Sequence, residues 1–157
     1  MSCRSDSIVI TLLISTLLIG TPLAHTGATG VVKKRMDAMS DMGDKSKLIA
    51  AMLKGESDYD AKTVSEVADA YIKHGADIPG LFPDDEMSRT SSETEALPAI
   101  WDEWQDFVEL SAKLTNDSKA LKKLADSGIT MGTLKKAFVK ATKNCSTCHK
   151  RFREPKD

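Results

Sequence analysis

The feature that most constrains this chain lies near its C-terminus, where five residues run Cys145-Ser146-Thr147-Cys148-His149. Two cysteines separated by two residues and followed at once by histidine have the spacing of a c-type haem attachment site. The spacing suits the chemistry, because positions three and four apart share one face of a helix. Two thiols can then add to the vinyl groups on one porphyrin edge while the imidazole reaches the iron. The motif therefore predicts one haem c, held covalently through Cys145 and Cys148, with His149 as an iron ligand.

Two other uses of paired cysteines fit this sequence less well. A structural zinc site needs four protein ligands, and of the three cysteines and three histidines, Cys3 and His25 lie near the N-terminus. A thioredoxin-like pair is expected beside a βαβ pattern, and the sequence has no alternating apolar run bounded by turn residues. A haem-free bundle whose cysteines bind metal or cycle as thiols is therefore the weakest alternative.

The first 24 residues have the pattern of a secretory signal peptide. A short polar segment that contains Arg4 is followed by the apolar run 8–20 and then by small residues. The run is shorter than the ~20 apolar residues of a membrane-spanning helix, which favours a cleaved signal over an uncleaved anchor. Cleavage is predicted after Ala24, with Ala28 as second choice. The pattern predicts a periplasmic protein without a membrane span, exported to the compartment of the haem-attachment machinery.

The remaining segment, residues 25–157, has a length and charge that suit one haem domain. About 130 residues are enough for a single hydrophobic core. The formal net charge of the chain is −1, so there is no basic excess of the kind that indicates nucleic-acid binding.

Apolar residues at helical spacing predict an all-α fold, an antiparallel four-helix bundle around the haem. The predicted helices cover residues 30–54, 61–75, 98–126 and 130–152. Asp60 suits an N-cap, Gly75 suits a helix end and Pro98 suits a first helical position. The run 116–118, Asn-Asp-Ser, is a candidate break. Residues 76–97 are expected to form a long crossover loop, and such loops are often functional.

Several short motifs are spread along the predicted domain. They are Arg35, Met39 and Met42-Gly43 in the first helix, Tyr59-Asp60-Ala61 before the second, Leu81-Phe82-Pro83 in the crossover, Thr94-Glu95-Ala96 and Leu97-Pro98-Ala99-Ile100-Trp101 before the third, and Phe152-Arg153 after the cysteines. Together with a haem motif near the C-terminus, this set resembles the class II c-type cytochromes, the cytochrome c′-like four-helix bundles. Phe152 departs from the pattern, since many members have tyrosine there.

The resemblance implies roles for residues outside the haem motif. Arg35 would lie near a haem propionate, because a guanidinium pairs well with a carboxylate. Arg153 would lie on the proximal side of the haem near His149, where it would modulate the imidazole and limit solvent access. Trp101 and Phe82 would help to pack the haem pocket.

The resemblance also assigns the distal face of the iron to the fourth residue after the first-helix arginine, which is Met39. Members with an apolar residue there have five-coordinate iron and bind small gases, whereas members with methionine have low-spin, six-coordinate iron. Met39 therefore implies His/Met ligation, which raises the haem potential. Methionine is also a common core filler. Met36, Met39 and Met42 share one broad helix face, and Met36 is the rival ligand.

Two functions stay open. The first is an electron carrier, not an enzyme, that exchanges one electron in transient complexes with redox partner proteins. The second is a five-coordinate protein that binds nitric oxide or carbon monoxide. Basic residues of the last helix form either a solvated face or a docking patch for an acidic redox partner: Lys135, Lys136, Lys140, Lys143, Lys150 and Arg151. The resemblance leaves both a monomer and a homodimer open. Family members that form dimers use their first two helices in the interface.

Overall fold

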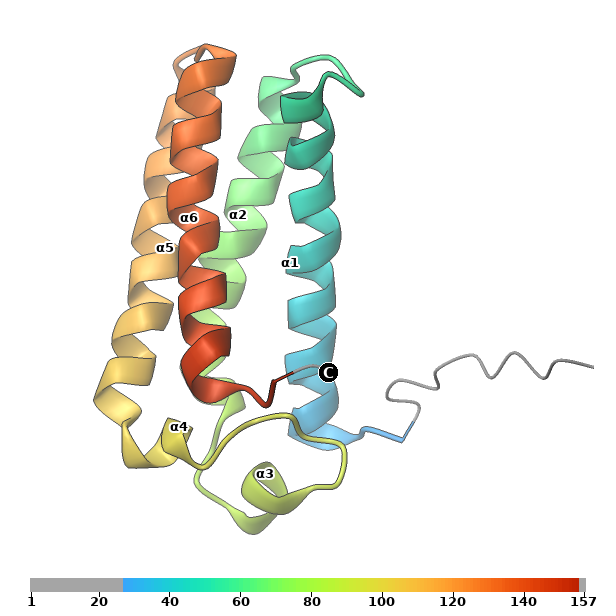
Figure 1. Ribbon diagram of the computed structural model, residues 1–157, viewed down its shortest axis with the longest axis vertical. Helices are drawn as coiled ribbons and strands as arrows, with labels where there is room; N and C mark the ends of the chain where they lie inside the picture. Colours follow the sequence, from blue (N-terminus) through green and yellow to red (C-terminus); the bar gives the residue numbers. More distant parts are fainter. Residues whose placement is uncertain (1–26, 156–157) are drawn as a thin grey trace, which may run out of the picture.

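A computed structural model describes residues 27–155, so the predicted signal peptide and its cleavage after Ala24 lie outside the described residues. Four long helices form the bundle in Figure 1: α1 (Gly30–Lys54), α2 (Ala61–Asp77), α5 (Trp104–Asp126) and α6 (Met131–Phe152). The crossover between α2 and α5 holds the short helices η1 (Ile78–Leu81), α3 (Glu86–Thr90) and α4 (Ala99–Asp102). Within residues 27–155 there is no strand, only an isolated antiparallel bridge between Ala96 and Arg153. The predicted all-α four-helix bundle is confirmed.

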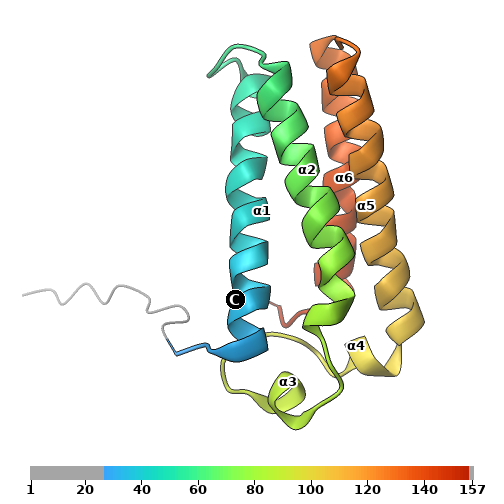
Figure 2. The same ribbon diagram turned by 180° about the vertical axis from the view of Figure 1, so that it is seen from behind.

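The crossover closes one end of the bundle. Successive long helices run antiparallel, with α1 beside α2, α2 beside α5 and α5 beside α6, as Figures 1 and 2 show from opposite sides. The crossover is longer than a link between two neighbouring helices needs. In both views it passes below the start of α1 and the end of α6. The end that holds the predicted haem motif is therefore the end that the crossover covers.

Three of the predicted helix ends coincide with capping residues. Gly55 follows α1 in the left-handed region, with φ of 76°, and glycine adopts this conformation without a steric penalty. The Asp60 side chain accepts hydrogen bonds from backbone N–H groups at the start of α2. Thr130 caps the start of α6 in the same way.

Two predicted boundaries are wrong. Helix α2 continues through Gly75 to Asp77, because Gly75 lies where α2 meets α5. A Cβ atom on Gly75 would come within 2.5 Å of Thr115 Oγ1, so glycine here permits a close helix contact rather than ending the helix. The third segment breaks at Glu103, where the crossover joins the bundle, and not at residues 116–118.

Residues 116–118 stay helical because the polar side chain at the centre of this run faces α6. Asp117 is 8% exposed and accepts a hydrogen bond of 2.9 Å from Asn144 Nδ2. It also pairs with Lys140 at 3.0 Å. Burial raises the pKa of Asp117, and the bonds from Asn144 and Lys140 lower it by more, so this pKa lies below its usual value. The contact ties α5 to α6 directly before Cys145.

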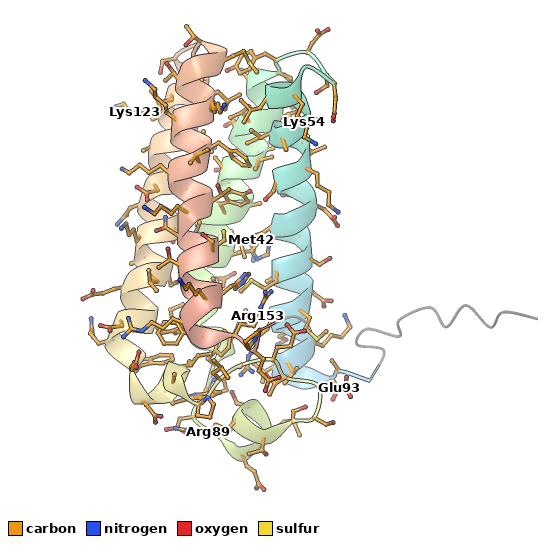
Figure 3. All side chains as sticks on the ribbon, viewed as in Figure 1. Met42, Lys54, Arg89, Glu93, Lys123 and Arg153 are labelled. Carbon is orange, nitrogen blue, oxygen red and sulfur yellow. The ribbon has the colours of Figure 1, made fainter. Side chains whose placement is uncertain are left out.

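The apolar core fills the space between the helices, and the charged side chains lie outside it apart from the buried Arg35 and Asp117. The largest fully buried side chains are Tyr71, Ile49, Ile100, Leu121 and Leu134. Burying one large apolar side chain contributes about 1.5–3 kcal/mol. Figure 3 places Lys54 and Lys123 at one end of the bundle and Arg89, Glu93 and Arg153 at the crossover end. The crossover end therefore combines an apolar interior with charged groups at its rim.

Candidate haem-binding site

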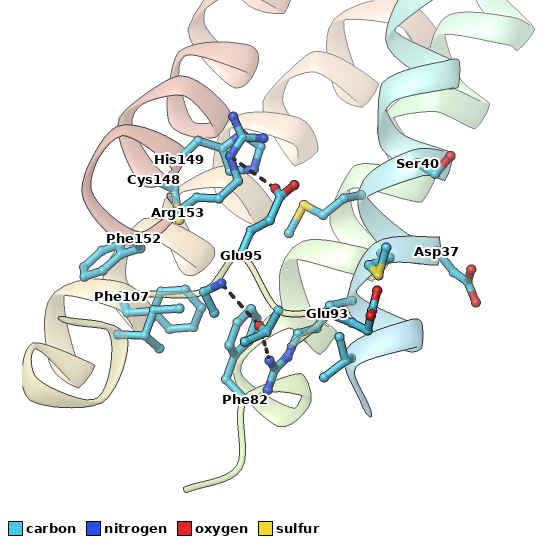
Figure 4. A pocket seen from close by; sticks show the side chains of 17 residues that line it. Asp37, Ser40, Phe82, Glu93, Glu95, Phe107, Cys148, His149, Phe152 and Arg153 are labelled. Carbon is cyan, nitrogen blue, oxygen red and sulfur yellow. Dashed lines mark hydrogen bonds and ion pairs between the residues drawn. The ribbon is translucent and has the colours of Figure 1, made fainter. Parts of the chain in front are cut away.

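A cavity of about 540 Å³ lies between α1 and α6 at the crossover end of the bundle, and Figure 4 shows the side chains around it. Its apolar wall includes Val32, Ile100 and Phe107. The volume falls within the range of about 300–1,000 Å³ that is common for cofactor and small-molecule sites. The cavity is therefore large enough to be considered as the site of the predicted haem.

Helix α6 presents the haem motif to this cavity. Cys148 and His149 line the cavity. Cys145, one turn earlier, is half-buried and packs against the hydrophobic core instead. The two intervening residues of the motif are exposed, and the Ser146 and Thr147 hydroxyls each donate a hydrogen bond to a carbonyl one turn earlier. The helix thus turns the thiols and the imidazole inward and the hydroxyls outward, as the spacing requires.

Both thiols are poor nucleophiles in this environment. Burial raises the pKa of Cys145. Burial and the neighbouring Cys145 together raise the pKa of Cys148 to about 11. Reactive and metal-binding cysteines usually have a lowered pKa. Among residues 27–155, no group of three or more histidine, cysteine, aspartate or glutamate side chains is arranged to hold a metal ion. These features disfavour the haem-free alternative with a metal site or a thiol cycle.

Helix α1 presents two thioethers to the same cavity. Met36 and Met39 both line it. Met39 is partly buried and also packs against the core. Met42, on the same helix face, is 6% exposed and belongs to the core itself. Of the three methionines at helical spacing, two therefore face the cavity and one fills the core.

Arg35 fastens the crossover to α1. It is 5% exposed and lines the cavity. Its Nε donates a hydrogen bond to the Leu81 carbonyl at 2.6 Å. Its Nη1 donates to the Ser88 carbonyl at 3.1 Å and to Thr94 Oγ1 at 3.4 Å, and Nη2 donates to Ser88 Oγ. One guanidinium thus connects three separate positions of the crossover, a function that the sequence does not predict.

The charge of Arg35 lies at the cavity wall. Its guanidinium carbon is 4.0 Å from the centre of the Phe82 ring, a cation–π contact. Burial lowers the pKa of Arg35 to about 10, and the negative charge of Asp85 opposes this shift. The group is still protonated at neutral pH. A guanidinium has five N–H donors, and four of them have partners among the described residues.

Arg153 supplies a second positive charge to the cavity. Its Nε is buried and has no hydrogen-bond partner within the described part of the chain. The Glu95 carboxylate lies 3.9 Å away, close enough for an ion pair but too far for a hydrogen bond. A buried donor without a partner costs about 1–3 kcal/mol. This atom therefore favours binding of an anionic group in the cavity, such as a haem carboxylate.

The predicted pocket aromatics have different positions. Phe82 lines the cavity. Trp101 lies behind it and donates hydrogen bonds from Nε1 to the Phe82 and Pro83 carbonyls, each at 3.2 Å. Phe107 extends the wall, with ring centres 4.9 Å from Phe82 and 5.4 Å from Phe152 in edge-on contacts. Trp101 therefore supports the wall from outside the cavity.

Sequence reasoning misses the polar residues that the crossover brings to the site. Ser88 and Thr94 bind Arg35, and Glu95 pairs with Arg153. These residues have no periodic pattern and follow no strand or long helix. The sequence offers two signals here, the Ser/Thr/Glu-rich composition of residues 88–95 and the Thr94-Glu95-Ala96 motif of the resemblance, and neither assigns these residues a contact.

The lining as a whole fits a haem. The apolar and aromatic walls suit the porphyrin face, and the two arginines suit its carboxylates. A thiol and an imidazole on α6 oppose two thioethers on α1. Soft sulfur and imidazole nitrogen are both common axial ligands of haem iron.

Comparisons with known proteins identify the family of the chain. The family model for cytochrome c′ matches residues 30–153. A cytochrome c′ from Rhodopseudomonas palustris is 37% identical over 134 residues, which cover 82% of this chain and 84% of the relative. A cytochrome c-556 from Agrobacterium tumefaciens (strain apple 185) is 34% identical over 130 residues, covering 82% of this chain and 98% of the relative. The solved structure of Rhodopseudomonas palustris cytochrome c′ has a TM-score of 0.74 at 34% identity and covers 83% of this chain and 100% of its own. The chain belongs to the cytochrome c′ family, the class II c-type cytochromes.

Proposed function

We propose that this protein is a mono-haem electron carrier whose iron has His149 and Met39 as axial ligands. Members of the family bind haem c covalently, and we assign the two thioether bonds to Cys145 and Cys148. The observation that carries the proposal is that Met39 and His149 line one cavity from two different helices, α1 and α6. The bound iron supplies one-electron exchange between its ferric and ferrous states, and Met/His ligation raises its potential.

The remaining site residues hold and enclose the haem in this proposal. Arg35 and Arg153 neutralise the propionates, because both cations lie at the cavity wall. Arg153 has the buried Nε without a hydrogen-bond partner among the described residues, so it has more to gain from an anion than Arg35 has. Phe82 packs on the haem, and Trp101 holds the Phe82 backbone in place.

We also propose export to the periplasm before the haem is attached. The N-terminal pattern of a polar start and the apolar run 8–20 supports this location. None of the helices in residues 27–155 combines the length and apolarity of a membrane span. The buried, protonated thiols also fit a protein that depends on an attachment machinery rather than on its own thiol reactivity.

The deciding experiment is an optical spectrum of the mature protein, produced with the haem-attachment machinery and recorded oxidised, reduced, and reduced under carbon monoxide. We expect a low-spin reduced spectrum that carbon monoxide leaves unchanged, with the methionine–iron charge-transfer band present in the oxidised form. A high-spin spectrum that shifts with carbon monoxide would reject Met39 as a ligand.

The second candidate function is gas binding by five-coordinate iron. The observation in its favour is that Met39 packs against the hydrophobic core, which is what a methionine with a purely structural role does. In that case the distal face would accept nitric oxide or carbon monoxide. Relatives of this chain include proteins named cytochrome c′ as well as cytochrome c-556.

An acidic redox partner fits the exposed face of α6. This helix contains no aspartate or glutamate, and its five lysines are exposed: Lys135, Lys136, Lys140, Lys143 and Lys150. Val139 is 53% exposed among them. Opposite charge steers a transient encounter, and a small apolar centre lets the two surfaces make contact. Since the cysteines lie on the same helix, a partner bound here would be close to the proposed haem edge.

Charge reversal on this face is expected to slow electron transfer. Lys143→Glu should reduce the second-order rate constant with an acidic flavodoxin, used as a probe, by about threefold to tenfold at 10 mM ionic strength. The difference should vanish near 1 M salt, where charges are screened within about 3 Å. Stopped-flow absorbance measures the rate. Lys123→Glu, at the far end of the bundle in Figure 3, makes the same charge change and should alter the rate much less. Equal effects of the two variants would reject a localised docking face.

The state of assembly is a separate question. A solved cytochrome c′ with the same fold, 20% identical to this chain, undergoes ligand-controlled dimer dissociation, so this fold is compatible with dimers.

A further inference from the structure

We propose that Glu95 is a positioning residue for His149, and that the charge of the Glu95–Arg153 pair sets the potential of the haem. This inference rests on the proposed role of His149 as an iron ligand. It does not depend on Met39, because it concerns only the proximal side of the iron. Neither the motif nor the resemblance gives Glu95 a role.

The backbone around Glu95 is fixed on both sides to the end of α6. The Glu154 N–H donates to the Glu95 carbonyl at 2.8 Å, and the Leu97 N–H donates to the Phe152 carbonyl at 3.0 Å. These bonds flank the antiparallel bridge between Ala96 and Arg153. These contacts, which we call the clasp, join residues 95–97 of the crossover to residues 152–154, directly after the haem motif. A side chain at residue 95 is held at a nearly fixed distance from the haem motif.

The side chain of Glu95 points from this clasp toward α6. Figure 4 shows its carboxylate directed at the place where His149 and Arg153 lie together. All three residues line the cavity. The side chains of Glu95 and Arg153 are 33% and 34% exposed, so water screens their ion pair only in part. A carboxylate, a guanidinium and an imidazole therefore meet at the proximal wall.

This arrangement has a direct chemical consequence for an imidazole that binds iron. The ring nitrogen that does not bind the metal usually donates its N–H to a carboxylate, a carbonyl or water, which fixes the ring and raises its basicity. Glu95 is the acceptor we assign. A more basic imidazole and a nearby negative charge both stabilise the ferric over the ferrous iron. Arg153 offsets part of that charge, so the two residues act on the potential in opposite directions.

The test is a reductive titration of the mature holoprotein in which one electron is delivered per haem through mediators. Glu95→Gln keeps the shape but removes the charge. It should shift the equilibrium toward the ferrous form about tenfold. This corresponds to a rise of about 59 mV in the reduction potential of a one-electron couple. Arg153→Gln should shift the potential the opposite way. If the Glu95–Arg153 pair had only a structural role, both variants would change thermal stability in the same direction. Shifts of the reduction potential in opposite directions are not expected from such a role.

Glu93→Gln is the matched control. Glu93 lies in the same loop, carries the same charge and also lines the cavity, but its carboxyl end lies near Gly27, just before the start of α1, and not beside His149. Its shift should be less than half that of Glu95→Gln. Equal shifts for the two glutamates, or a lowered potential in Glu95→Gln, would overturn the proposal. If Glu95→Gln loses its haem, the Arg153→Gln variant provides the test. An unchanged or raised reduction potential in Arg153→Gln would also contradict the proposal.

The proposed function and this inference fail in different ways. A wild-type spectrum that shifts with carbon monoxide would remove Met39 as a ligand, and the Glu95 titration would still be valid. A potential that does not respond to Glu95 would leave the low-spin spectrum intact and remove only the positioning role.

Discussion

Replacing Met39 with alanine is expected to open the distal face of the iron to carbon monoxide and to leave the haem covalently attached. The attachment residues lie on α6, whereas Met39 lies on α1, so the substitution removes one side of the cavity wall without touching the other. Loss of the thioether should convert the reduced protein from low-spin to high-spin. Carbon monoxide should then bind stoichiometrically, where the parent protein binds none. Optical spectra before and after carbon monoxide addition measure the change.

The two neighbouring methionines provide the controls. Met36→Ala removes the other thioether that lines the cavity, and Met42→Ala removes one from the core. Both should keep the low-spin spectrum, although Met42→Ala should destabilise the fold by about 2–5 kcal/mol as a large-to-small core change. His149→Ala should instead impair haem incorporation and folding together. A low-spin, carbon monoxide-insensitive Met39→Ala would show that Met39 is not the ligand and would direct attention to Met36.

The α6 part of the site is predictable from sequence because local chemistry dictates it. A haem motif must place two thiols and an imidazole on one face, and only a helix does so at this spacing. Apolar periodicity and the N-cap residue Asp60 then predict the long helices. Gly75 shows the limit of such rules. A helix end and a close helix contact both favour glycine, and only the packing of α2 against α5 separates them.

The crossover part of the site is not predictable in the same way. Thr94 and Glu95 reach the cavity, and Ser88 reaches Arg35 beside it, because Arg35 and the end of α6 bind this segment from outside it. These contacts join residues far apart in the chain and leave no periodic signal. The resemblance to the family singles out Arg35 and implies that it pairs with a haem propionate. In the structure, most of the hydrogen bonds of Arg35 go to the crossover.

Replacing Arg35 with methionine is expected to lower the free energy of unfolding by about 3 kcal/mol or more, since each buried acceptor left without a donor costs about 1–3 kcal/mol. The Leu81 carbonyl and both Ser88 oxygens lose their bonds to the guanidinium. Arg35→Lys should recover little of the loss, because one ammonium cannot reproduce the planar fork. Urea denaturation of the holoprotein measures the change, and limited proteolysis should show earlier cleavage within residues 81–94.

Arg89→Ala is the matched control, because Arg89 lies in the same crossover but at its surface. It pairs with Asp84 and stands 4.7 Å from the centre of the Trp101 ring. Exposed ion pairs of this kind contribute about 0–1 kcal/mol, so its loss should be several times smaller. The difference follows from burial: Arg35 is 5% exposed and its partner Ser88 is fully buried, whereas water can replace the exposed ion pair of Arg89. Equal destabilisation by Arg35→Met and Arg89→Ala would mean that the crossover is held by its clasp to the end of α6, and that Arg35 serves the cavity alone.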